Sequence, residues 1–223
     1  MTGSPAAPPE RLRAQVLSEW APVTPLRPPW RRAAWIAPLA ALTAGVAALS
    51  WGPQDDWAAP GFALTATLSA AQWIGGLWLL GLAFRDAIPG RALGRAATWA
   101  VLGGALLVLA VNLAAKDAVA AAVVPAGRDL RFWAICLRGS LMLAMPVLIV
   151  GAVLLSRAFP MRPAWTGALA GLAAGVLADS GWRLGCFVTE ASHVVGAHWL
   201  AIVASGALGA AIAWLADAVR WRR

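Results

Sequence analysis

The sequence predicts an all-α integral membrane protein, with a bundle of six transmembrane helices behind a short cytoplasmic N-terminal tail. Hydrophobic residues make up 61% of the chain and charged residues only 13%, whereas soluble domains carry about 25% charged residues. Six apolar runs are each long enough to cross a bilayer, which takes about 20 residues. Within lipid the backbone must satisfy its own hydrogen bonds, so each run is expected to be a helix.

The chain divides into a tail, residues 1–32, and a six-helix membrane domain, residues 33–223. The tail is polar and rich in proline and arginine, and it lacks the early apolar core of a cleavable signal peptide. The expected spans are Ala33–Trp51, Gly61–Phe84, Ala96–Ala115, Phe132–Leu155, Ala164–Trp182 and Ala197–Ala218. Tryptophans near the ends of these spans are typical of membrane interfaces.

The tail combines a short amphipathic helix with a proline-dense stretch. Apolar residues fall on one side of the helix, and the prolines favour an extended polyproline conformation. The candidate binding residues are Leu12, Val16, Leu17, Trp20, Pro22, Pro25 and Pro28. The tail is either a linker that positions the first span or a segment that docks on a partner protein.

Basic residues are distributed unequally between the two expected sides. If the N-terminus is cytoplasmic, thirteen arginines lie inside, and only Lys116, Arg128, Arg131 and Arg183 lie outside. This bias predicts a multi-pass protein of the inner membrane with both termini in the cytoplasm. The same topology accounts for the net charge of +8, so direct binding of nucleic acid is not expected.

Small residues in the fifth expected span indicate close helix packing. Gly167, Gly171 and Gly175 recur every four residues, a spacing that lets another helix approach its backbone. We therefore expect this span to lie at the centre of the bundle.

The two cysteines are expected on the same, outer face. Cys136 lies about one helical turn below that surface in the fourth span, and Cys186 lies in the last outer loop. They are either a redox or sensing pair, or two small buried residues that never meet. At a similar depth, Arg138 and Asp179 have opposite charges inside spans, which predicts an intramembrane ion pair.

The same outer face carries residue types that bind metals. The candidate ligands are Cys136, Cys186, His193 and His198. The histidines are five residues apart and are not expected to share a helix face, and no CxxC motif is present. A permanent structural zinc site is therefore not expected, whereas loose capture of a soft metal ion remains open.

Signatures of enzymes are missing from the sequence. It contains no GxSxG, HExxH or glycine-rich phosphate loop, so no catalytic activity and no cofactor are expected. The alternative to a regulatory protein is a small membrane transporter, or a membrane-embedded enzyme with a polar site at the outer face.

Three segments resemble the NrsF-type membrane anti-sigma factors. They are EWAPVTPLRPPWRR (Glu19–Arg32), Cys136 with the later loop GCFVTEASHVVGAHW, and MRPAWTGALAG (Met161–Gly171). Together they extend, in matching order, over nearly the whole chain. One departure is Gly185, which stands before Cys186 where that family often has histidine.

The resemblance implies a function in transcription regulation and the stress response. Proteins of that type hold an extracytoplasmic-function sigma factor inactive at the inner membrane until an oxidant or a heavy metal releases it. Two cysteines sense the signal there, which carries over to Cys136 and Cys186. A light signal, as in other membrane anti-sigma factors of this size, is a further alternative.

Overall fold

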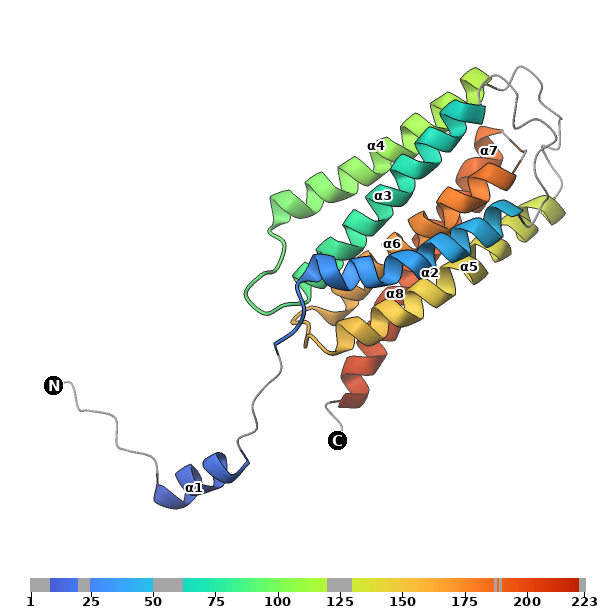
Figure 1. Cartoon of the computed structure of the whole chain (residues 1–223). Helices are drawn as coiled ribbons and strands as arrows, with labels where there is room; N and C mark the ends of the chain where they lie inside the picture. The colour runs from blue at the N-terminus through green and yellow to red at the C-terminus, as the bar shows by residue number, and fades with distance from the viewer. Residues whose placement is uncertain are drawn as a thin grey trace.

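The computed structural model describes residues 9–19, 25–49, 62–119, 130–186, 188 and 190–220. The regular structure within these ranges is helical throughout. Its elements are α1 (Glu10–Ser18), α2 (Pro29–Leu49), α3 (Phe62–Asp86), α4 (Arg95–Val119), α5 (Leu130–Ser156), α6 (Pro163–Gly185), α7 (Ala191–His193), the π-helical turn η1 (Val194–Trp199) and α8 (Leu200–Arg220). The long helices lie side by side and alternate in direction, while α1 lies outside the bundle (Figure 1).

Five segments are long and apolar enough to cross a membrane. They are α2, α3, α5, the first part of α4 (Arg95–Ala114), and Ala191–Arg220. The sixth long helix, α6, contains Asp179 and Arg183 and is not among these five. The described part of the chain therefore contains five candidate spans, and the expected count of six transmembrane helices is not matched.

The glycine-bearing helix α6 is the centre of the bundle. It packs against α2, α3, α5 and α8, and most of its residues are buried. A Cβ atom at Gly167 or Gly171 would collide with the backbone of α8, and one at Gly175 would lie 2.8 Å from the Cα atom of Ile202. The predicted close approach along this glycine face is confirmed, and α8 is the helix that makes it.

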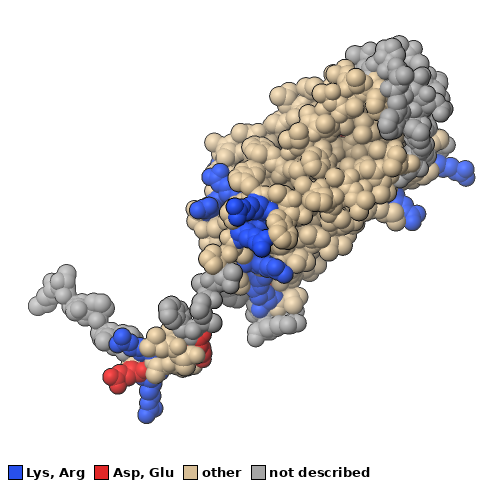
Figure 2. Space-filling model, viewed as in Figure 1, with Lys and Arg blue, Asp and Glu red and all other residues tan. Residues whose placement is uncertain are grey.

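Arginines gather at the end of the bundle where α2 begins. Arg162 there pairs with the buried Asp86 at 2.7 Å, joining the start of α6 to the end of α3. At the same end, Arg220 of α8 donates to the Ser156 carbonyl of α5. On the face shown in Figure 2, basic side chains lie toward the ends of the bundle, and the broad middle carries no charge.

Candidate functional site

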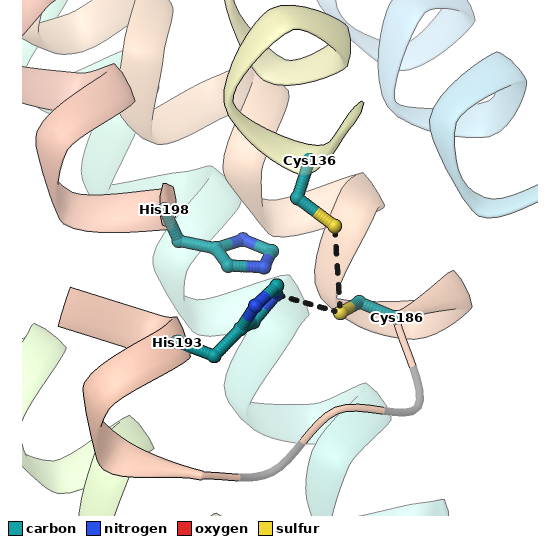
Figure 3. A group of neighbouring side chains, drawn as sticks. All are labelled: Cys136, Cys186, His193 and His198. Carbon is teal, nitrogen blue, oxygen red and sulfur yellow. Dashed lines mark hydrogen bonds between the residues drawn. The ribbon is translucent and has the colours of Figure 1, made fainter. Parts of the chain in front are cut away.

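Four side chains that are distant in sequence meet near the other end of the bundle. Cys136 comes from α5, Cys186 directly follows α6, His193 ends α7, and His198 lies in η1 (Figure 3). One ligand atom from each of these four residues, the Cys/His cluster, lies within 4.8 Å of every other. All four side chains are buried, with exposed fractions of 5% or less. The fold therefore assembles the complete set of candidate ligands.

The contacts inside the Cys/His cluster are close. The two Sγ atoms are 4.0 Å apart, and Cys186 Sγ lies 3.6 Å from His193 Nε2 (Figure 3). This sulfur–sulfur distance is that of two thiols in contact, because a disulfide bond is about 2.05 Å long. The Trp133 ring stands edge-on to His193, with 6.1 Å between ring centroids. The cluster is thus buried and has an aromatic ring on one side.

The π-helical turn explains how the two histidines come together. In an α-helix, residues five apart point in different directions, and the sequence expectation for His193 and His198 was wrong for that reason. In η1 the backbone N–H of Leu200 instead donates to the Val195 carbonyl, five residues earlier. An i→i+5 pattern places residues five apart one turn apart. The two imidazole centroids are accordingly only 5.4 Å apart.

A buried carboxylate supports the Cys/His cluster from behind. Asp179 of α6 is fully buried, and one of its oxygens lies 2.7 Å from His198 Nδ1. Its other oxygen accepts hydrogen bonds from Arg183 Nε at 2.9 Å and from Gln72 Nε2 of α3 at 2.7 Å. Removing a charge from water costs several kcal/mol. A buried charge therefore needs such partners, because the energy of pairing must offset that cost.

The partner of Asp179 differs from the one expected. Arg138 is exposed and does not pair with Asp179, whereas Arg183, 2% exposed, does so at 2.9 Å. The error has a simple origin: the expected span ended at Trp182, which placed Arg183 in a loop. Because α6 continues to Gly185, Arg183 lies one turn after Asp179 on the same face.

The surroundings of Cys186 favour the reactive form of its thiol. Contact with the Cys136 thiol is the main influence that holds the pKa of Cys186 well below its ordinary value, and the hydrogen bond with His193 acts in the same direction. Burial opposes both effects. The thiolate is the form that reacts with oxidants and binds metals.

The candidate binding residues of the tail lie away from this site. Leu12, Val16 and Leu17 on α1 are 53%, 58% and 61% exposed. Pro25 and Pro28 are also exposed, while Trp20 and Pro22 lie outside the described residues.

Two site residues were missed by the sequence reasoning: Gln72 and Arg183. The four-residue spacing from Asp179 to Arg183 was the available signal for the second.

These features define a helical bundle whose described part has five segments long and apolar enough to span a membrane. A buried thiol–imidazole cluster lies near one end, and a separate amphipathic helix precedes the bundle. The chain belongs to the NrsF family: the family model described as negative regulator of sigma F matches residues 17–221. No curated protein and no solved structure matches the chain. The family description names a sigma factor as the object of regulation, which agrees with the resemblance seen in the sequence.

Proposed function

We propose that this protein is an inner-membrane anti-sigma factor without catalytic activity. It sequesters an extracytoplasmic-function sigma factor and releases it when a stress signal, such as an oxidant, a heavy metal or light, reaches the outer face. The observation that carries the proposal is the family match over residues 17–221. The match includes nearly all of the described helices, so the regulatory role is proposed for this chain as a whole.

The bundle serves as the membrane anchor. Five segments have the length and apolarity of membrane spans, and large apolar side chains such as Trp99 and Leu107 of α4 are more than 60% exposed. Such exposure is unfavourable in water by about 25 cal/mol per Å² of apolar surface, and it is harmless in lipid. The arginine-rich end, where α2 begins and α8 ends, then faces the cytoplasm.

The helix α1 is the proposed site of sigma-factor binding. It has no buried residue, and its exposed Leu12, Val16 and Leu17 have no partner helix in the described part of the chain. An amphipathic helix of this kind binds by laying its apolar side in a groove of another protein. Its place before α2 puts it on the same side as the arginine-rich end.

The Cys/His cluster is the proposed sensor. A change at Cys136 and Cys186 alters the connection between α5, the end of α6 and the α7–η1 segment that leads into α8. The signal must then travel through rigid helices with two alternative packings. The glycine face between α6 and α8 is the proposed slipping surface, because at Gly167 and Gly171 the backbones of the two helices meet directly, with no side chain of α6 between them.

Co-purification with an extracytoplasmic-function sigma factor of the same organism tests the proposal. The full-length protein, solubilised from membranes in mild detergent, is expected to retain that sigma factor and to lose it after exposure of cells to oxidant or cadmium. In parallel, deletion of the gene is expected to raise transcription from the sigma-dependent promoter. Unchanged transcription in the deletion strain, together with no retained sigma factor, would contradict the function.

A further inference from the structure

We propose that the Cys/His cluster is a four-ligand binding site for a divalent cation of the zinc and cadmium class, with Asp179 as the residue that positions His198. The ligand atoms are Sγ of Cys136 and Cys186 and Nε2 of His193 and His198. The metal site would identify the class of signal that the protein senses, and this regulatory role rests on the proposed function. Binding of the ion itself does not depend on that function.

The distances match those of a tetrahedral site. With metal–sulfur bonds of about 2.3 Å and metal–nitrogen bonds of about 2.0–2.1 Å, a tetrahedron separates two sulfurs by about 3.8 Å and a sulfur from a nitrogen by about 3.6 Å. The observed separations are 4.0 Å between the sulfurs and 3.6 Å between Cys186 Sγ and His193 Nε2. Small side-chain adjustments therefore suffice to bring four ligands around one ion.

The donor set selects the class of ion. Two thiolates and two imidazoles suit zinc and softer divalent ions, whereas magnesium and calcium require oxygen ligands. Both cysteines must lose their protons to bind, so two protons leave and a neutral assembly of one dication and two thiolates forms. The Asp179–Arg183 pair is neutral as well. An ion bound here leaves no uncompensated charge in the interior.

His198 is oriented for metal binding before any ion arrives. An ionised carboxylate can only accept a hydrogen bond, so the contact of Asp179 with Nδ1 of His198 places the ring hydrogen on Nδ1. In the neutral imidazole, which is the form that binds metals, Nε2 then carries the lone pair. That atom is buried and has no hydrogen-bond partner in the described part of the chain. A metal-binding histidine held by a carboxylate in this way is a recurrent arrangement. Loss of the supporting carboxylate lowers metal affinity by about 10–100-fold.

The site connects four helical segments of the bundle. The ligands come from α5, from the residue after α6, and from α7 and η1, and Asp179 extends the network to Gln72 of α3. An ion that draws the four ligand atoms together constrains all these segments at once. The ion can shift the equilibrium between two helix packings only by the difference between its binding free energies in the two packings.

Cobalt binding to the purified, reduced full-length protein in detergent tests the site, because tetrahedral Co²⁺ with thiolate ligands has strong visible and charge-transfer absorption. The wild type is expected to bind one Co²⁺ per chain and to release it to Zn²⁺ or Cd²⁺. His193→Ala and His198→Ala should each lose the tetrahedral spectrum. Asp179→Asn should keep the spectrum but weaken binding about 10–100-fold.

Glu190→Gln is the matched control for Asp179→Asn. Glu190 is a nearby carboxylate that contacts Ser192 and lies outside the Cys/His cluster, so its neutralisation should leave cobalt affinity unchanged. If Asp179→Asn does not fold because Arg183 is left unpaired, the double variant Asp179→Asn/Arg183→Gln removes both charges together.

Two results would overturn the proposal: a reduced wild type that binds no Co²⁺, or histidine variants that retain the wild-type spectrum and affinity. No sigma factor is present in this titration. The two experiments are therefore independent. Absence of metal binding would not contradict sigma-factor binding, and absence of sigma-factor binding would not contradict the metal site.

Discussion

Nδ1 of His198 lies 2.7 Å from a carboxylate oxygen of Asp179, and both side chains are 1% exposed or less. The contact joins the π-helical turn before α8 to the middle helix of the bundle. It also links the Cys/His cluster to the buried Asp179–Arg183 ion pair, because Asp179 contacts both His198 and Arg183.

Because it pairs with the buried Arg183, Asp179 is expected to contribute to stability. Asp179→Ala would leave Arg183 buried without its carboxylate partner, at a cost of about 3–5 kcal/mol. We expect a clearly lower midpoint of thermal unfolding in detergent, measured by loss of helical circular dichroism. Arg138→Ala, which removes an exposed arginine, is the control and should leave the midpoint nearly unchanged. Equal midpoints for the two variants would mean that the ion pair contributes little.

The cysteines are predicted to be required for induction and not for repression. Cys136→Ser and Cys186→Ser should each weaken the rise of sigma-dependent promoter activity after oxidant or cadmium treatment, because the hydroxyl replaces the thiolate that reacts or binds metal. Basal repression should persist, since serine is similar in size. Wild-type induction in the double serine variant would mean that the cysteines only fill space in the core. Loss of basal repression would mean that they are needed for the structure.

The apolar side of the tail is predicted to hold the sigma factor. Apolar anchors, and tryptophan above all, can contribute about 2 kcal/mol or more each to a protein interface. Val16→Ala together with Trp20→Ala should therefore abolish co-purification of the sigma factor, while the protein still inserts into membranes. Ser18→Ala, on the same short helix, is the control. Full retention of the sigma factor by the double variant would reduce the tail to a linker.

The glycine face of α6 is predicted to tolerate no side chain. In Gly171→Ala the new methyl group would collide with the Ser205 backbone of α8, so the helices must separate. Gly103→Ala on α4 meets no atom within 4 Å, and alanine is the better helix former by about 1 kcal/mol. The first change should lower thermal stability and the second should preserve or raise it. Equal stability of both variants would exclude tight α6–α8 packing.

The fold was largely predictable because apolar length, basic ends and glycine spacing are all local signals. They gave the long helices and the central place of α6. The details of the site depend on features that such signals miss. Arg183 was assigned to a loop because the span was ended at Trp182, so Arg138 was paired with Asp179 in its place. The meeting of His193 with His198 depends on a π-helical turn, and hydrophobic periodicity does not reveal one.

A π-helical turn amounts to an α-helix that has accommodated one additional residue. The Cys/His cluster therefore depends on the length of the segment between His193 and His198 as well as on residue type. Removal of any single residue from 194–197 would let the backbone return to the ordinary α-helical pattern. Every cysteine, histidine and carboxylate would still be present, and the two histidines, then four residues apart, would still share one face of an ordinary α-helix. In this segment a single deletion should therefore preserve the approach of His193 and His198, whereas a single insertion should turn His198 away from the Cys/His cluster.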